Sequence, residues 1–280
     1  MLKANINTQT ESYSIQKSDT ENFSLAANTI FKFTASANYE FIGLSIGFSP
    51  KDRSLPYKSS FQDITLRLFL NQWIQNMQYR SVRGFYREGE ILNGQQEEFP
   101  DFKTISWNGA TSFVINPNFS LKHVLFNTEW QRKSTGSLIP TLRYGYQRFS
   151  DKIDGNKEAQ NIYSIALASD YYYTWVIENN WFVTPSVSPA IGIRYTDYNL
   201  AEVSEQNTLF TTALNLGLYF GYTSENIVAG ANFNFDSKAT NAKTNIISDR
   251  SYAKLYFGYR FNAPKSLERR VDWLKNKIKK

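Results

Sequence analysis

The stretch AKLYFGYRF, from Ala253 to Phe261, alternates strictly between two kinds of side chain. Alanine, leucine, phenylalanine and tyrosine occupy its odd positions, whereas its even positions hold Lys254, Tyr256, Gly258 and Arg260. Successive side chains of a β-strand point to opposite faces, so this pattern predicts a strand with one apolar and one more polar face.

The same period of two recurs along most of the chain. Thirteen segments show it: 3–15, 28–38, 42–49, 60–71, 75–87, 103–115, 119–131, 137–149, 160–176, 181–195, 208–222, 226–236 and 251–261. Short connections at 39–41, 71–74, 116–118, 178–180 and 224–226 are interspersed with longer polar ones, an arrangement typical of outer-membrane barrels. Consecutive strands of such a barrel run in opposite directions. If every short turn lies at the same end, thirteen segments do not fit this alternation. Between residues 119 and 149, either one segment is not a membrane strand or a further strand has been missed.

We therefore prefer twelve strands, within a range of ten to fourteen, and expect part of residues 127–137 to fold into the lumen. Fourteen strands is the other solution to the parity problem. The expected fold is all-β: a transmembrane antiparallel up-and-down β-barrel followed by a short C-terminal amphipathic helix.

A soluble antiparallel barrel with its apolar side inward is the alternative, and it inverts the two faces. Three features favour the membrane. The apolar face carries large residues without a small-to-large taper, and rings gather at strand ends: Tyr39, Phe41, Trp73, Trp175, Trp181, Tyr219 and Tyr222. The other face carries charges suited to a polar lumen: Lys32, Arg67, Arg143, Asp170, Arg194, Asp236, Lys254 and Arg260.

The composition excludes several classes of site. The 280 residues include no cysteine and a single histidine, His123, so disulfides, thiolate sites and multi-histidine metal centres are excluded. We expect no cofactor. Aromatic residues make up 16% of the chain, yet the mean hydropathy is −0.46. No apolar run is long enough for a transmembrane helix. Because Met1 begins no signal peptide, an exported chain would be in its mature form.

The net charge of +6 is concentrated near the C-terminus. Residues 263–280 hold seven basic and two acidic side chains, a net of +5, which leaves +1 for the rest. This distribution does not support a nucleic-acid partner.

We divide the chain into a barrel, residues 1–262, and a basic periplasmic helix, residues 263–280. Apolar residues recur there at helical spacing, and the candidate membrane-surface residues are Arg269, Arg270, Trp273, Lys275 and Lys277. Docking to an envelope protein, plugging of the barrel mouth and a disordered segment are the alternatives. Tyr259 and Phe261 form the expected barrel-closing signal of the last strand.

Three motifs resemble those of a Bacteroidota outer-membrane barrel family that is described only as a domain of unknown function. They are RSVRGFY (Arg80–Tyr86), EWQRKSTGS (Glu129–Ser137) and GYRFNAPK (Gly258–Lys265). The resemblance covers nearly the whole chain. It implies an outer-membrane location and an antiparallel barrel, and it implies no activity.

The candidate site is a polar cluster in the lumen that either binds a solute or plugs the barrel: Arg67, Arg80, Glu129, Gln131, Lys133, Arg143, Asp170 and Arg194. Glu129, Gln131 and Lys133 share one face of a predicted strand, where they form a hydrogen-bond network, bind a polar solute or carry out acid/base chemistry. The four arginines either line an anion-selective constriction or are neutralised by inward carboxylates: Glu11, Glu129, Asp170 and Asp236.

The single histidine and two prolines of the segment 181–195 each have a functional and a simpler structural interpretation. His123 with Ser134 or Ser137 is the one candidate for a Ser–His pair, but about 11 residues separate His123 from Ser134, over ~30 Å along a straight strand. A histidine of the wall or lumen is the simpler interpretation. Pro185 and Pro189 mark a bulge or a local gap in strand pairing, or a lateral opening for lipid.

The leading functional hypothesis is a non-enzymatic outer-membrane barrel, either a narrow pore or solute-binding channel or a component of a cell-envelope assembly. The alternative is a lipid-modifying enzyme of the hydrolase or acyltransferase type, and a loop-presenting adhesin is a weaker third. The expected partners are the outer-membrane bilayer with its lipopolysaccharide and an envelope protein at the C-terminal helix.

Overall fold

The computed structural model describes residues 2–7, 12–18, 21–27, 32–49, 59–92, 95–153, 156–200, 203–240, 246–247 and 252–260. Its elements are β1 (Leu2–Asn7), β2 (Ser12–Ser18), β3 (Glu21–Ala26), β4 (Lys32–Tyr39), β5 (Ile42–Phe48), β6 (Ser60–Leu70), β7 (Trp73–Leu92), β8 (Gln95–Phe113), the π-helical turn η1 (Lys122–Phe126), β9 (Thr135–Ile153), β10 (Asn156–Ile177), β11 (Trp181–Leu200), β12 (Val203–Thr223), β13 (Ile227–Thr240), β14 (Ile246–Ile247) and β15 (Tyr252–Tyr259). No helix in these ranges is long and apolar enough to cross a membrane.

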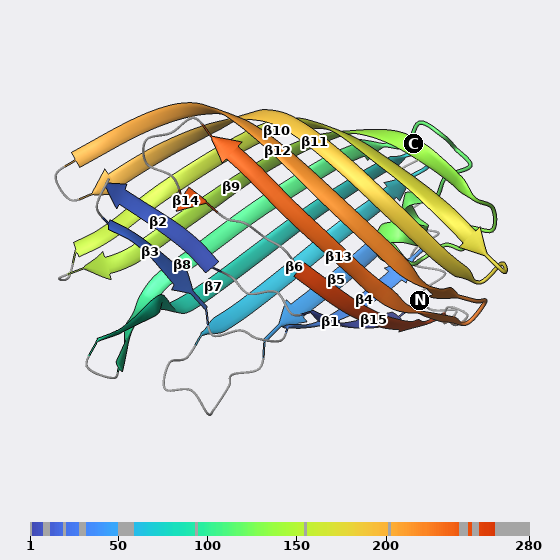
Figure 1. Ribbon diagram of the computed structural model, residues 1–280, viewed down its shortest axis with the longest axis horizontal. Helices are drawn as coiled ribbons and strands as arrows, with labels where there is room; N and C mark the ends of the chain where they lie inside the picture. The colour runs from blue at the N-terminus through green and yellow to red at the C-terminus, as the bar shows by residue number, and fades with distance from the viewer. Residues whose placement is uncertain are drawn as a thin grey trace, which may run out of the picture.

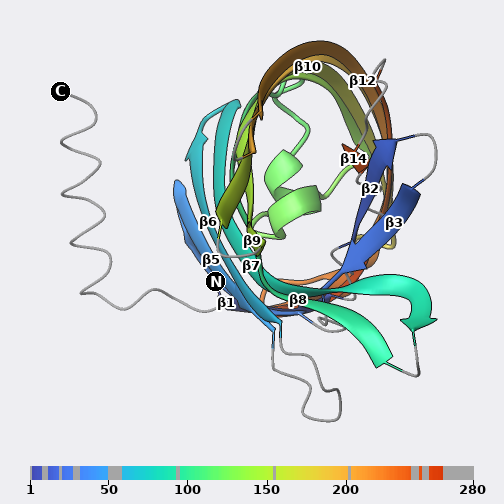
Figure 2. The ribbon, with the colours of Figure 1, turned by 90° about the vertical axis from the view of Figure 1, so that its left-hand side faces the viewer.

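Twelve of these strands close into an antiparallel barrel (Figures 1 and 2). The order around the ring is β7-β6-β5-β4-β1-β15-β13-β12-β11-β10-β9-β8, and a pairing between β7 and β8 closes it. Strand β1 pairs with β15 on one side and with β4 on the other, which joins the two ends of the chain's barrel strands. The preferred count of twelve strands is confirmed.

A hairpin of β2 and β3 extends the sheet at one end of the barrel, at the left of Figure 1. Strand β3 pairs with the far end of β7, through Leu25 and Arg87 among others, and β2 pairs with β14. The predicted strand over 3–15 therefore enters the barrel only as far as Asn7.

The short turns gather at one end, which we call the short-turn mouth. They connect β4 to β5, β6 to β7, β10 to β11 and β12 to β13. Tight reversals hold Glu40, Asn71, Glu178 and Asn179 at positive φ. In outer-membrane barrels the short turns face the periplasm and the longer loops face outward. We call the opposite end the long-loop mouth.

The alternation separates a lipid-like face from a polar one. On β15, Leu255 and Phe257 are 63% and 56% exposed, whereas the intervening Tyr256 is buried. On β10, Leu167 is 58% exposed on the outside and Asp170 is 6% exposed on the inside. A continuous apolar outer wall is unfavourable in water, and it matches the band that faces hydrocarbon in a membrane barrel. The apolar face therefore points outward, as the sequence predicts.

Aromatic side chains frame this band. Five outward rings lie in one register across β7 to β11: Tyr79, Trp107, Tyr146, Tyr163 and Tyr195. Neighbouring centroids are 4.7 Å apart for Tyr79 and Trp107, and 5.1 Å for Tyr146 and Tyr163.

Other rings line the short-turn mouth. The centroids of Trp73 and Phe113 are 4.9 Å apart, and those of Trp181 and Tyr222 are 5.3 Å apart. Along β10, Tyr163 and Trp175 are separated by roughly 40 Å of strand, or about 30 Å across a membrane at the usual tilt. Tyr219 was expected in this girdle, but it points inward and is buried.

A pair of arginine substitutions on β10 tests which face meets lipid. Leu167→Arg places a charge on the outer band between the two aromatic rings, so it is expected to lower the free energy of unfolding by about 2–4 kcal/mol. The matched Ser164→Arg, on the inner face, is expected to have little effect. Denaturant unfolding of the barrel in phospholipid vesicles measures both, and the reverse order would indicate the inverted, soluble barrel.

Candidate functional site: a polar lumen closed by an inner segment

The connection between β8 and β9 folds into the barrel. We call residues 114–134 the inner segment; it contains η1 (Lys122–Phe126), and Figure 2 shows this helical turn inside the ring of strands. The strand predicted over 119–131 is therefore wrong. The prediction that part of residues 127–137 folds into the lumen is correct, but the inner segment begins earlier, at residue 114. Its run of Val124, Leu125 and Phe126 is apolar at consecutive positions, which a turn enclosed by the wall accommodates better than a two-faced strand.

Apolar side chains anchor the inner segment to the wall. Phe119, Leu121, Val124 and Phe126 are buried in one cluster with inward residues of the barrel: Phe69, Ile74, Ile139, Tyr172, Phe182 and Tyr219. The ring centroids of Phe69 and Phe126 are 5.3 Å apart. This cluster lies at the short-turn mouth, where β6 and β12 end and β11 begins.

Hydrogen bonds fold the inner segment onto itself. The Ser120 hydroxyl donates to Glu129 Oε2 at 2.5 Å, and Lys122 Nζ lies 2.9 Å from Glu129 Oε1. The buried Gln131 side chain accepts from the Ser120 N–H at 2.7 Å and donates to the Asn118 carbonyl at 2.9 Å. Glu129 and Gln131 thus stabilise the segment, whereas Lys133 is exposed. No strand face brings these three side chains together.

Arg260 ties the inner segment to the last strand. Its Nη2 donates to the carbonyl oxygens of Asn127 and Glu129 at 3.1 Å each, and to Thr223 Oγ1 at 3.1 Å. Trp130 Nε1 donates to the Asn179 carbonyl, in a short turn, at 2.9 Å. The alternation placed Arg260 on the inner face, but its partners are backbone carbonyls of a segment whose position the alternation does not reveal.

His123 is fully buried in the inner segment, against the ring of Phe182 at 4.3 Å between centroids. Its Nδ1 lies 3.2 Å from the Glu129 carbonyl oxygen, which can only accept, so Nδ1 carries the proton. Nε2 has no hydrogen-bond partner within the described residues. Ser134 Oγ accepts from the Val176 N–H, and Ser137 Oγ donates to the Leu138 carbonyl. The candidate Ser–His pair is therefore not assembled.

A second apolar cluster lies at the long-loop mouth. It contains Leu25 of β3 together with inward or nearby residues of the wall: Phe61, Val82, Phe85 and Phe149. On β6, Phe61 of this cluster and Phe69 of the first are separated by about 26 Å of strand. The inward residues between them are Asp63, Thr65 and Arg67. The middle of the lumen is thus polar, with an apolar cluster at either end.

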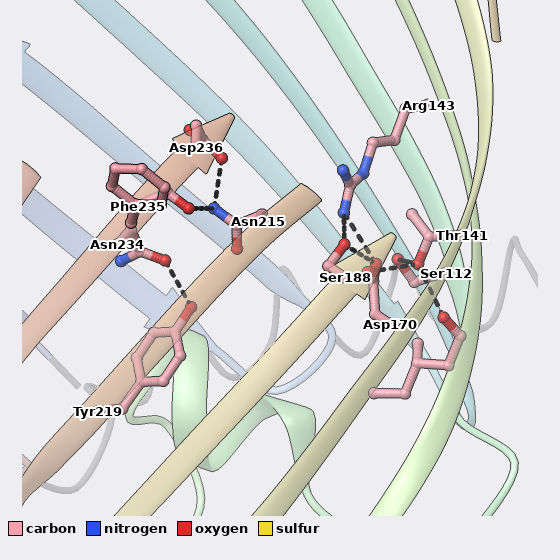
Figure 3. A network of polar contacts seen from close by, with 11 residues as sticks. Ser112, Thr141, Arg143, Asp170, Ser188, Asn215, Tyr219, Asn234, Phe235 and Asp236 are labelled. Carbon is pink, nitrogen blue, oxygen red and sulfur yellow. Dashed lines mark hydrogen bonds and ion pairs between the residues drawn. The ribbon is translucent and has the colours of Figure 1, made fainter. Parts of the chain in front are cut away.

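Two ion pairs neutralise part of the inner wall. Arg80 Nε lies 3.0 Å from Asp63 Oδ2, and Arg143 Nη2 lies 2.8 Å from Asp170 Oδ1. Asp170 also accepts from Thr141 and Ser188, as Figure 3 shows. Pairing of Arg143 with Asp170 agrees with the pairwise alternative considered above. Asp63 was missed, although its odd position on the same strand as Arg67 already places it on the inner face.

The remaining polar side chains are distributed around the lumen. Asn215 donates to Asp236, and the Tyr219 hydroxyl donates to Asn234 Oδ1 at 3.0 Å (Figure 3). Arg194 lies on the inner face of β11, away from the inner segment. The eight predicted site residues therefore do not form one cluster: five belong to the wall and three to the inner segment.

The two prolines of β11 leave gaps in pairing but cause no shift of register. Pro185 and Pro189 pair in sequence with Leu218 and Leu214 of β12, while the ladder to β10 is interrupted opposite both. The sheet nevertheless resumes in register on either side.

Several predicted features lie outside the described residues: Glu11, Phe261 and the helix over 263–280, with Arg269, Arg270, Trp273, Lys275 and Lys277.

The chain matches one family model, the domain of unknown function DUF4421, over residues 1–261. The chain belongs to the DUF4421 family. This agrees with the resemblance noted in the sequence. No curated protein matches the chain. The closed sheet and its apolar belt make this DUF4421 protein an integral barrel of the outer membrane.

Solved structures similar to this DUF4421 barrel include two autotransporter domains. The translocator domain of NalP from Neisseria meningitidis shares 9% identity over 93% of this chain and 88% of that chain, with a TM-score of 0.48. The β-domain of Bordetella BrkA shares 9% identity over 93% and 98%, with a TM-score of 0.44. OmpT of Vibrio cholerae shares 6% identity over 92% and 97%, with a TM-score of 0.38. These similarities concern architecture alone.

The buried histidine predicts that acid loosens the inner segment. Burial lowers the pKa of His123 from 6.5 to about 4; the hydrogen bond to Glu129 opposes this shift and the charge of Arg260 adds to it. Between these two values an unfolded segment binds a proton that the folded segment does not. The stabilisation is therefore complete above about pH 6.5 and is lost as the pH falls towards 4, by roughly 3 kcal/mol in total.

Hydrogen-exchange protection of residues 119–126 measures this effect between pH 5 and 7, once the rates are corrected for intrinsic exchange. The wild-type opening free energy should fall with pH, while His123→Gln, which cannot titrate, should give a flat profile. Equal pH dependence in both proteins would assign the effect to other groups.

Proposed function

We propose that this DUF4421 barrel is a non-enzymatic, narrow channel of the outer membrane whose short-turn mouth is closed at rest by the inner segment. One observation carries the proposal: apolar residues of the segment fill that mouth, while the lumen beyond it is lined by charged and hydroxyl side chains. A barrel without a solute would gain more stability from an apolar interior than from charges that need partners.

The contacts of the inner segment suit a movable gate. Its ion pair, between Lys122 and Glu129, lies within the segment, so the segment keeps this contact when it leaves the wall. The contact with the wall is a largely apolar surface together with hydrogen bonds from Arg260 and Trp130. Such contacts break and reform without any covalent change.

The lipid-modifying enzyme receives less support. His123 is enclosed by apolar neighbours on the inside of the barrel, and no serine hydroxyl is bonded to its ring within the described residues. A lipid substrate would approach from the outer face, which this ring does not reach.

Conductance in planar bilayers tests the gate. Replacing residues 117–136 with a short Asn-Gly turn like the other short connections should convert a low wild-type conductance into a steady, ohmic one. Arg260→Gln, which removes the tie, should give intermittent openings, whereas Arg148→Gln, which removes a charge from the outer face, should behave as wild type. Heat-modifiable migration on gels confirms folding. A folded replacement variant that conducts no better than wild type would contradict the proposal.

We also propose a role in an assembly of the cell envelope, through the basic residues 263–280. Arg260, which binds carbonyls of the inner segment, lies just before them in the chain, so a partner bound there would act close to the gate. The Bacteroidota origin implied by the sequence resemblance stays a prediction.

Co-purification from native membranes in mild detergent tests this second role. Deletion of residues 263–280 should release a partner that the full chain retains. Changing Arg269, Arg270, Lys275 and Lys277 to glutamine should weaken the association if charge dominates it. A partner retained equally by the deletion variant would contradict the role of this segment.

A further inference from the structure

The outward-facing cations of the strands lie together. Among the described side chains, they occur only on three neighbouring strands near the long-loop mouth: Arg83 of β7, Lys103 of β8 and Arg148 of β9. Lys103 is directly opposite Arg83. It is also a diagonal neighbour of Arg148, because its direct partner on β9 is Ser150, two positions further on. Direct partners lie about 5 Å apart and diagonal ones about 7–8 Å, so these like charges repel one another and a bound anion would stabilise them.

The nearby carboxylates pair with only one of these cations. Asp101 Oδ1 lies 2.6 Å from Arg83 Nη2. The other described carboxylates near this part of the wall are further along β8, five or six residues from Lys103, or two strands away from Arg148: Glu97, Glu98 and Asp197. Within the described residues, the side chains of Lys103 and Arg148 form no ion pair or hydrogen bond. These two cations are therefore available to a ligand.

Asn161 adds uncharged donors beside Arg148. It is the direct partner of Arg148 on β10, and its Oδ1 accepts a hydrogen bond from the Tyr146 hydroxyl at 2.9 Å. This bond uses the acceptor of the amide and leaves its two N–H groups, which have no partner within the described residues. Lys103, Arg148 and Asn161 thus offer donors from three neighbouring strands to one region of the outer surface.

The same strands carry the row of five outward rings described above. This row ends at Ile64 of β6 on one side and at Thr208 of β12 on the other, so rings and cations share one part of the circumference. Arg148 follows Tyr146 by two positions, on the side of the long-loop mouth. Aromatic rings of a membrane barrel mark the boundary between the hydrocarbon layer and the headgroups. Donors just beyond them therefore lie at the level of the headgroups in the outer leaflet.

We propose that Lys103, Arg148 and Asn161 form a binding site on the outer wall for the phosphate-bearing headgroup of an outer-leaflet lipid. Lipopolysaccharide, expected as a partner from the sequence, belongs to this class of lipid. The planar guanidinium supplies parallel donors that match two oxygens of a phosphate, and the ammonium supplies a point charge. The amide of Asn161 donates beside them. Arg83, held by Asp101, borders the site and adds to its positive potential.

The anion belongs to a lipid rather than to a free phosphate ion. At an exposed position, attraction between charges alone is weak and is screened by salt. A lipid adds apolar contacts, because its acyl chains lie along the outer wall below the rings, where Ile165 and Leu167 of β10 are exposed. One molecule thus meets both the donors and the apolar belt. The site lies outside the lumen and does not depend on the proposed channel.

Native mass spectrometry of the full chain in uncharged detergent tests the site, with diphosphorylated lipid A and the same lipid without its phosphates as probes. The wild type should retain one phosphorylated molecule. Lys103→Gln and Arg148→Gln should each raise its Kd about fivefold, and the double variant about thirtyfold. Asn161→Ala, which removes donors without changing the charge, should raise it about fivefold. Lys133→Gln, the same change of charge on the exposed end of the inner segment, should bind as wild type does. Heat-modifiable migration confirms that each variant is folded.

Three results would overturn the site. Equal retention of the lipid without phosphates would mean that the apolar wall alone binds it. Equal weakening by Lys133→Gln would mean that net charge alone attracts it. Displacement of the lipid by inorganic phosphate, but not by chloride at the same ionic strength, would mean that the donors select a free anion. None of these results bears on the conductance of the variant that lacks residues 117–136, so failure of the site and failure of the channel are distinguishable.

Discussion

The structure depends on one constraint: no backbone N–H or C=O can remain unpaired inside the hydrocarbon layer. Strand β1 meets this constraint at the closure, because it pairs with β15 on one side and with β4 on the other. A barrel of eight strands is filled by its own side chains, whereas twelve strands leave additional space. The inner segment occupies that space at the short-turn mouth.

The side chains of the outer and inner faces of the barrel have different surroundings. Outside, apolar side chains meet lipid and need no partners. Inside, each charge needs a partner, and the wall supplies partners unevenly. Asp63 and Asp170 form ion pairs with Arg80 and Arg143, and backbone carbonyls accept hydrogen bonds from Nη2 of Arg260. Arg67, in contrast, is held by the Ser45 hydroxyl and the ring of Phe126, without a carboxylate partner among the described residues.

Sequence reasoning succeeded where the signal is local. Period-two alternation located every barrel strand, and it distinguished Leu255 and Phe257 from Lys254 and Tyr256. It failed over 119–131, because a segment enclosed by a wall carries apolar residues that mimic a strand. It also missed the β2–β3 hairpin, whose pairing with β7 depends on contacts between residues about 60 positions apart.

The sequence by itself determined which face of each strand meets lipid, since that property needs only the order of neighbouring residues and an aqueous or apolar surrounding. It also located the four tight reversals of the short-turn mouth, whereas the connection predicted at 116–118 leads into the inner segment instead of another strand. The tertiary structure alone decided what lies in the lumen and which charges are neutralised there. Arg143 pairs with Asp170, which is 27 residues away, and Arg260 donates to the carbonyl oxygen of Asn127, which is 133 residues away. Such partners follow from strand order and closure, which no local pattern encodes.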